Sequence, residues 1–236
     1  MSSQPSPASP SSLASPTAKP SLPVVPLRAQ IIDACRKMEA SGLNRGTSGN
    51  VSCRDGDHFL VTPSGMPVEK MTPACIVAVG FDGQVIGLGK PSSEWHFHRD
   101  ILRSRPEINA VVHTHSPHAT ALACLNEDLP PFHYMIAIAG GDTVRCAPYA
   151  LFGTETLSQH AVAALERRKA CLLANHGLIA LGRDLDEALS IAVEIESLCE
   201  QYLLARQVGK PVLLSAEQMR EVIAKFQGYG RNAQTS

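Results

Sequence analysis

The sequence lacks the features that mark membrane and nucleic-acid-binding proteins. It contains no run of eighteen apolar residues, so we predict no transmembrane helix and no membrane partner. Lysine and arginine number 21 against 22 aspartate and glutamate residues, giving a net charge of −1. Because a nucleic-acid-binding surface needs an excess of positive charge, no nucleic-acid partner is expected.

Paired cysteines are also absent. The seven cysteines are widely spaced and form no C-x-x-C pair, which argues against both a disulfide framework and a thiolate zinc site. Most of them lie among aliphatic residues, as buried free thiols do. We therefore expect a reducing compartment and a cytoplasmic protein.

The chain divides by composition into a tail and a domain. Residues 1–26 are mostly Ser, Pro and Ala, and they lack the apolar core of a signal peptide and the arginines of a mitochondrial presequence. This composition predicts a disordered tail. We predict a single domain over residues 27–230 and a flexible C-terminus over 231–236.

Helical and strand-like segments are interspersed through the predicted domain. Helical spacing is found over 26–43, 93–105, 155–168 and 184–208, and a last helix is predicted from Ser215. Strands are predicted over 50–54, 58–62, 75–81, 84–89, 109–115, 170–176 and 178–182. This order predicts a layered α/β domain, and the Asp82-Gly83 hairpin turn makes its sheet mixed rather than parallel.

The stretch NAVVHTHSPH suggests a metal site. On a strand, residues two apart share a face, so His113 and His115 are expected to emerge together at a spacing that suits zinc. His176 follows another apolar strand and precedes Gly177, which allows close backbone approach. Three histidines would leave a coordination position open for water or substrate.

A second histidine pair, His96 and His98 in EWHFH, has the same spacing but is predicted not to bind a metal. The segment is predicted to be helical, and two helical residues differ in direction by about 200°. His58, His118, His133 and His160 show no partner pattern. We interpret these four as structural or surface residues.

Six stretches resemble the class II aldolase/adducin-head family: GLNRGTSGNVS, TPSG, PSSEWHFH, VVHTHSPH, HYMIAIAGG and NHGLIA. They occur in order between about Leu27 and Tyr229, and they are most similar to the L-fuculose-1-phosphate aldolase type. The resemblance implies a three-layer α/β/α domain around a mixed, largely antiparallel sheet. It also implies a homotetramer with its active site at a subunit interface.

The resemblance implies a zinc-dependent lyase with one Zn²⁺ per subunit, bound by His113, His115 and His176. The expected reaction is retro-aldol cleavage of a short ketose 1-phosphate to dihydroxyacetone phosphate and an aldehyde. Candidate sugar phosphates are L-fuculose 1-phosphate and a 5-deoxy- or methylthio-ribulose 1-phosphate. Glu94 would ligate zinc in the free enzyme and move off it to act as acid/base. Without the histidines, Glu94 would be interpreted as an ordinary first-turn helix glutamate favoured by the helix dipole.

Three turns match the family's phosphate site. Their main-chain N–H groups and hydroxyls favour anions, and one turn stands at a predicted helix start. The residues at matching positions are Gly46, Thr47, Asn50, Ser64, Gly65, Ser92 and Ser93. Ser48 and Ser64 are mild departures, because close relatives often have Ala and Thr there.

Two tyrosines complete the implied site. Tyr134 matches a tyrosine that the family places at a neighbouring subunit's site, where it exchanges a proton with the aldehyde oxygen. Tyr229 matches a mobile C-terminal tyrosine that closes over the site. The alternatives are a core aromatic residue for Tyr134 and a fraying tail residue for Tyr229.

Other functions stay open at this stage. A pentulose-5-phosphate 4-epimerase or a methylthioribulose-1-phosphate dehydratase belongs to the same family, although the epimerases carry Asp where this chain has Glu94. A non-catalytic adducin-head-like interaction module would typically lack the metal ligands present here. A Schiff-base aldolase needs a lysine in an apolar pocket, whereas Lys70, Lys90 and Lys169 look solvent-exposed.

Overall fold

A computed structural model describes the backbone of residues 26–229 and the side chains through Phe226. The predicted 1–26 tail, apart from Pro26, and the predicted 231–236 C-terminus lie outside these residues. The strands are β1 (Asn50–Asp55), β2 (His58–Val61), β3 (Val77–Gly80), β4 (Val85–Ile86), β5 (Ala110–Thr114), β6 (Arg145–Ala147), β7 (Ala170–Leu173) and β8 (Gly177–Gly182).

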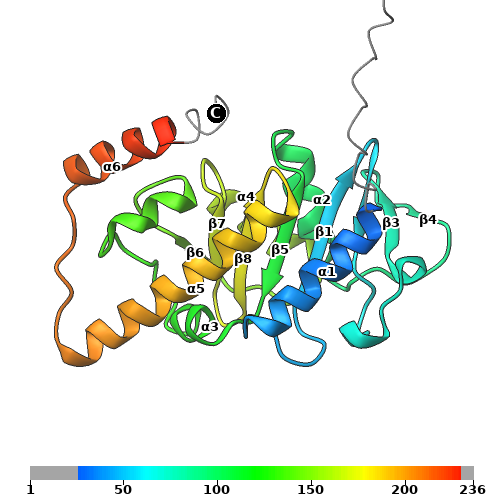
Figure 1. Ribbon diagram of the computed structural model, residues 1–236, viewed down its shortest axis with the longest axis horizontal. Coiled ribbons are helices and arrows are strands. Elements are labelled where there is room, and N and C mark those ends of the chain that lie inside the picture. The colour runs from blue at the N-terminus through cyan, green and yellow to red at the C-terminus, as the bar shows by residue number, and fades with distance from the viewer. Residues whose placement is uncertain (1–25, 230–236) are drawn as a thin grey trace, which may run out of the picture.

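These strands form one eight-stranded sheet in the order β4-β3-β2-β1-β5-β8-β7-β6 (Figure 1). Every neighbouring pair is antiparallel except β6 and β7, which run parallel. The predicted α/β class, with a mixed and largely antiparallel sheet, is confirmed.

Helices cover both faces of the sheet. They are α1 (Leu27–Ala40), α2 (Trp95–Ser104), α3 (Pro117–Ala123), α4 (Glu155–Ala164), α5 (Leu185–Val208) and α6 (Ala216–Tyr229), with 3₁₀ turns η1 (Val68–Lys70), η2 (Pro73–Cys75) and η3 (Tyr134–Ala139). Side-chain caps begin two of them, because Thr154 accepts from the Leu157 N–H and Asp184 from the Glu187 N–H.

Alternation along the strands creates two hydrophobic cores. Val111 and Ile179 point to the face covered by α2 and α4, whereas Val112 and Leu178 point to the face covered by α1, α3 and α5. Figure 1 shows α1 and α5 crossing the near face of the sheet. The three layers expected for the domain are therefore present.

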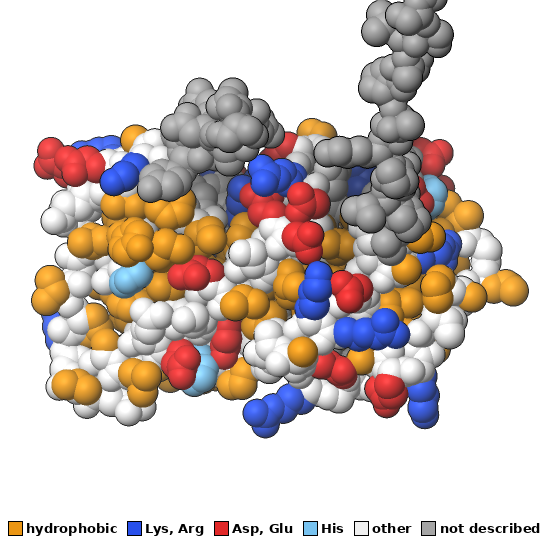
Figure 2. All heavy atoms as spheres, viewed as in Figure 1, with side chains coloured by type: hydrophobic (Ala, Val, Ile, Leu, Met, Phe, Trp, Pro, Cys, Tyr) orange, Lys and Arg blue, Asp and Glu red, His pale blue; other side chains and the backbone are white. Residues whose placement is uncertain are grey.

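The C-terminal helix α6 returns across the molecule and packs near η3 through Met219, which is 1% exposed. Hydrophobic side chains gather between α6 and α5, around the η3 segment, on the face shown in Figure 2. Phe132, Met135 and Ile138 contribute partly buried apolar surface there. Within the part of the chain that is described, no helix combines the length and apolarity needed to cross a membrane.

Candidate metal centre and active site

The predicted ligands meet at one edge of the sheet. His113 lies in β5 directly opposite Asn50 of β1, and His115 follows just beyond the end of β5. The turn between β7 and β8 brings His176 to the same edge, with Asn175 before it in the left-handed region at φ 55°. Two segments of chain that are distant in the sequence thus supply the three imidazoles.

The three imidazole rings surround a common point. Their centroids are 4.8 to 4.9 Å apart, and their planes are inclined to one another by 75° to 78°. Glu94 closes the group, with Oε2 3.3 Å from His113 Nε2 and Oε1 3.2 Å from His176 Nε2. One ligand atom from each of these four residues lies within 4.8 Å of the others. The expected ligand set is therefore assembled in the fold.

Gly177 is required for this approach. A Cβ at this position would lie 2.4 Å from the Thr114 carbonyl oxygen and 3.1 Å from His115 Cδ2. Both distances are shorter than ordinary van der Waals contact, and the first is to backbone that cannot yield easily. Only glycine lets β8 start this close to the end of β5.

The donor chemistry of the cluster fits a divalent cation. His113 Nδ1 is 3.0 Å from the Leu178 carbonyl oxygen, so Nδ1–H donates and Nε2 carries the lone pair. That nitrogen is 3.0 Å from His115 Nε2 and faces a carboxylate oxygen. Glu94 Oε1 is buried and makes no hydrogen bond within the described residues. Lone pairs and a negative charge that converge in this way require a proton or a cation between them.

The ionisation states agree with metal binding. Partial desolvation, reinforced by His113 and His176, lowers the pKa of His115 to about 4, so this imidazole is neutral near pH 7. Burial raises the pKa of Glu94, but the adjacent imidazoles of His113 and His176 outweigh burial and leave the pKa below its ordinary value. Neutral imidazoles and an ionised carboxylate are the forms that bind zinc.

The cluster borders a cavity of about 350 Å³. Six predicted phosphate ligands line it: Thr47, Asn50, Ser64, Gly65, Ser92 and Ser93. Backbone pairing holds two of these turns together, because the Ser64 N–H donates to the Lys90 carbonyl and Pro63 bridges to Pro91. Gly46 lines a smaller adjoining cavity instead of the main one.

Asn50 has a further role beside the predicted one. Its Nδ2 donates to Glu94 Oε2 at 2.9 Å, and its Oδ1 accepts from His98 Nε2 at 2.5 Å. The side chain is 6% exposed. One N–H of the amide therefore holds the carboxylate, and only the other is left for a phosphate oxygen.

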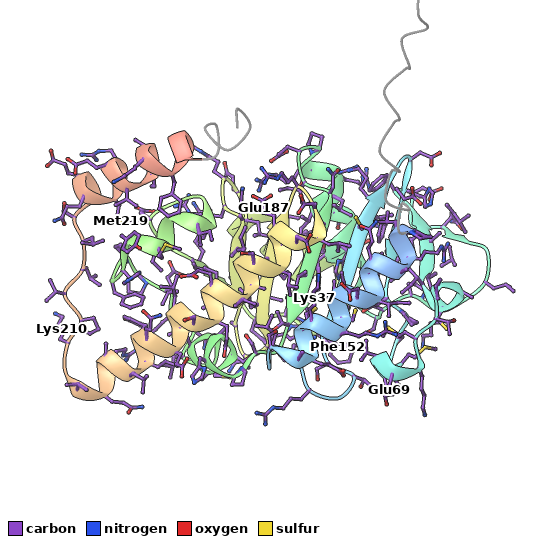
Figure 3. The ribbon with its side chains drawn as sticks, in the orientation of Figure 1. Lys37, Glu69, Phe152, Glu187, Lys210 and Met219 are labelled. Atoms are coloured by element: carbon purple, nitrogen blue, oxygen red, sulfur yellow. The ribbon has the colours of Figure 1, made fainter. Side chains whose placement is uncertain are left out.

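Several residues that line the cavity were not predicted as site residues, among them Tyr149, Ala150, Phe152 and Asn175. In the view of Figure 3, Phe152 lies toward the lower edge of the molecule. Tyr149 and Phe152 are 62% and 61% exposed and give the cavity an apolar wall beside its polar turns. No local pattern marks them, because the loop between β6 and α4 is placed only by tertiary packing.

The remaining predictions concern two histidines and two tyrosines. His96 and His98 lie on α2 outside the four-residue cluster, in agreement with the prediction that they do not bind the metal. Tyr134 begins η3, is 51% exposed and does not line its own chain's cavity. Tyr229 is the last residue of α6, and its side chain lies outside the described part of the molecule.

The exposure of three lysines and the state of the cysteines were also predicted from the sequence. Lys70 and Lys90 are exposed, as expected, but Lys169 is only half-exposed because its amine pairs with Glu187 at 2.7 Å. An ion-paired lysine that does not line the cavity beside the metal cluster does not fit a Schiff-base nucleophile. All seven cysteines lie in the described part of the chain and are free thiols there.

The fold and this cluster define a class of protein, and comparison with known families gives the same result. The chain belongs to the family described as the Class II Aldolase and Adducin N-terminal domain, whose model matches residues 29–203. The family prediction made from six sequence motifs is thus confirmed.

The relatives it resembles are aldolases. A 5-methylthioribulose-1-phosphate/5-deoxyribulose-1-phosphate aldolase of Rhodospirillum rubrum is 52% identical over 210 residues, covering 89% of this chain and 95% of the relative. An L-fuculose phosphate aldolase of Escherichia coli K12 is 49% identical over 205 residues, covering 86% and 95%. A solved L-fuculose 1-phosphate aldolase superimposes with a TM-score of 0.83 at 40% identity, covering 85% of this chain and 96% of its own.

Proposed function

We propose that this protein is a zinc-dependent aldolase that cleaves a short ketose 1-phosphate into dihydroxyacetone phosphate and an aldehyde. The observation that carries the proposal is the cluster of Glu94 with three imidazoles on the wall of a cavity bordered by Ser/Gly turns. A metal centre beside an anion-binding surface is what retro-aldol cleavage of a phosphorylated ketose needs.

Relatives and cavity shape narrow the substrate. The relatives named above act on 5-methylthioribulose 1-phosphate, 5-deoxyribulose 1-phosphate or L-fuculose phosphate, all of which end in an apolar methyl or methylthio group. Tyr149, Ala150 and Phe152 supply an apolar wall in this cavity. We propose that the phosphate lies at the Ser/Gly turns and the apolar end of the sugar lies against this wall.

In the proposed mechanism, His113, His115 and His176 would hold the zinc ion, and Glu94 stands beside them as an ionised carboxylate. A bound divalent ion supplies Lewis-acid stabilisation of the negative charge that develops on the ketose oxygens. As the C3–C4 bond breaks, the C4 hydroxyl loses its proton and becomes the aldehyde. Glu94, after taking up a proton from solvent, delivers it to C3 of the three-carbon fragment, and the proton released at C4 balances the one taken up.

Assembly is part of the proposal. Tyr134 is exposed, does not line its own chain's cavity and begins η3, around which hydrophobic side chains gather (Figure 2). These features support a homotetramer in which Tyr134 exchanges the proton on the aldehyde oxygen at a neighbouring subunit's site. Closure by Tyr229 stays a prediction. A cytoplasmic location also stays a prediction, supported by the free cysteines.

A substrate panel tests the function. Release of dihydroxyacetone phosphate should be measured from L-fuculose 1-phosphate, 5-deoxyribulose 1-phosphate and 5-methylthioribulose 1-phosphate, with and without a chelator. We expect release from at least one of them, dependent on the metal. Interconversion of pentulose 5-phosphates without release of dihydroxyacetone phosphate from any 1-phosphate would replace the aldolase with the epimerase alternative. Conversion of methylthioribulose 1-phosphate by loss of water would replace it with the dehydratase.

A further inference from the structure

A line of buried polar residues runs from the metal cluster into the α2 face of the sheet. Asn50 and Ser52 lie two apart on β1 and therefore point to the same face, toward α2. His98 of α2 meets both of them, with Nε2 2.5 Å from Asn50 Oδ1 and Nδ1 2.7 Å from Ser52 Oγ. Ser52 and His98 are 0% exposed.

Chemistry fixes the direction of every hydrogen bond in this line. The Glu94 carboxylate only accepts, so the atom of Asn50 that faces it at 2.9 Å must be the amide nitrogen. Asn50 Oδ1 then faces His98 and can only accept, so His98 carries its proton on Nε2. A neutral His98 has a lone pair on Nδ1, which accepts from the Ser52 hydroxyl. With a neutral His98, each hydrogen bond of the line has one donor and one acceptor.

The surroundings keep this arrangement dry and neutral. Phe97 stacks on the His98 ring at 4.6 Å and meets the His113 ring edge-on at 5.4 Å. Burial lowers the pKa of His98 to about 3, so the imidazole stays neutral at physiological pH. A neutral His98 donates from one nitrogen only, as the direction of the line requires.

We propose that His98 is a positioning residue for Glu94, acting through the side-chain amide of Asn50, with Ser52 completing the line. This inference rests on the proposed role of Glu94 at the metal centre. The line anchors Oε2 through Asn50 and leaves Oε1, which lacks a hydrogen bond within the described residues, as the oxygen for the metal or for proton transfer. His96 and His98 therefore both lie outside the metal cluster, but His98 supports that cluster through Asn50.

Two substitutions at one position separate positioning from packing. In His98→Gln the longer amide reaches the place of Nε2 and keeps a donor toward Asn50. In His98→Asn the shorter amide reaches only the place of Nδ1, and Asn50 loses its donor. Both remove the imidazole from the core, so each is the control for the other.

The readouts are the zinc Kd by chelator competition, and kcat and KM for the cleaved ketose 1-phosphate. Loss of an outer hydrogen-bond partner typically costs 10–100-fold in metal affinity or activity. We expect His98→Asn to weaken zinc binding and lower kcat by about tenfold each, with KM within about threefold, and His98→Gln to stay within about threefold of wild type. Equal effects of the two substitutions, whether large or absent, would overturn the proposal.

A spectrum of the unsubstituted protein tests the line without relying on a folded variant. Long-range ¹H–¹⁵N correlation of the metal-free chain should show His98 as the Nε2–H tautomer at pH 7. An Nδ1–H tautomer or a charged imidazole would overturn the proposed direction. A wild type that shows the Nε2–H tautomer but neither binds zinc nor releases dihydroxyacetone phosphate would instead refute the proposed function.

Discussion

Two histidine pairs with the same two-residue spacing have different environments in this molecule. At the end of β5, His113 and His115 turn their Nε2 atoms to within 3.0 Å of each other. On α2, His96 stacks on Trp95 with centroids 4.0 Å apart, whereas His98 is buried against β1. Secondary structure, not spacing, determines which pair can chelate an ion.

On α2, in contrast, side chains two residues apart point in different directions. Glu94 caps α2, and His98 follows it by four residues, the separation that places side chains on one helix face. His98 therefore lies on the side of α2 that carries Glu94, and His96 does not. The two-residue period of the strand brings the metal ligands together. The helical period places His98, which supports the carboxylate, on the same face of α2 as Glu94.

The largest effect should follow from replacing the two histidines at the end of β5, His113 and His115. His113→Asn/His115→Asn should lose bound metal and lower kcat/KM by about 10³-fold or more, because a metal ion supplies several kcal/mol of charge stabilisation. Metal analysis, kinetics and circular dichroism check this, and the spectrum should remain that of a folded protein. Full metal occupancy in the double variant would place the ion elsewhere.

Removing the acid/base should have the next largest effect. Glu94→Gln should lower kcat by about 10²–10⁴-fold, the usual range for general acid–base catalysis, with KM changed much less. Steady-state kinetics on the ketose 1-phosphate measures the split. A rise in KM at unchanged kcat would mean that Glu94 only binds substrate.

The pH dependence of the free energy of unfolding should show whether His98 is buried in its neutral form. The pKa of His98 is about 3 in the folded chain and about 6.5 when unfolded, so the unfolded state takes up the proton and stability falls as pH drops below about 6.5. Between pH 7 and 5 this amounts to about 2 kcal/mol. Urea unfolding of metal-free protein should show that His98→Gln loses about this much of the pH dependence. A wild-type-like dependence would show that His98 is not buried in the neutral form.

The smallest effect should come from the other member of the helix pair. His96→Asn should leave zinc stoichiometry and kcat unchanged and alter the free energy of unfolding by less than about 1 kcal/mol, since the residue is only partly buried. The substitution chiefly removes the stacking of the imidazole on the Trp95 ring. A drop in zinc content would show that His96, like His113 and His115, contributes to metal binding.

Much of the fold is visible in the sequence because its longer elements carry strong periodicity. The helix predicted over 184–208 forms as α5, and the strand predicted over 109–115 forms as β5. The strand predicted over 84–89 pairs only at Val85–Ile86, because the following chain bends through Gly87 and Gly89. β6 was missed, since three residues are too few to show a period.

The site was predictable where ligands follow a strand and unpredictable where tertiary packing decides. His113, His115 and His176 end or follow recognisable strands, so their convergence could be inferred. The apolar wall formed by Tyr149 and Phe152 comes from an irregular loop. The second role of Asn50 depends on the pairing of β1 with β5 and on the docking of α2, neither of which leaves a local pattern.

Exchange of hydrogen with solvent is the sharpest test of whether Glu94, beside the metal site, handles a proton on carbon. Metal-loaded enzyme should be incubated with dihydroxyacetone phosphate in D₂O without any aldehyde, and deuterium followed by NMR. We predict that one C3 hydrogen exchanges, that a chelator or Glu94→Gln stops the exchange, and that Tyr134→Phe spares it. Metal-loaded wild type that cleaves ketose 1-phosphates yet exchanges no hydrogen, or Glu94→Gln that exchanges at the wild-type rate, would refute this role of Glu94.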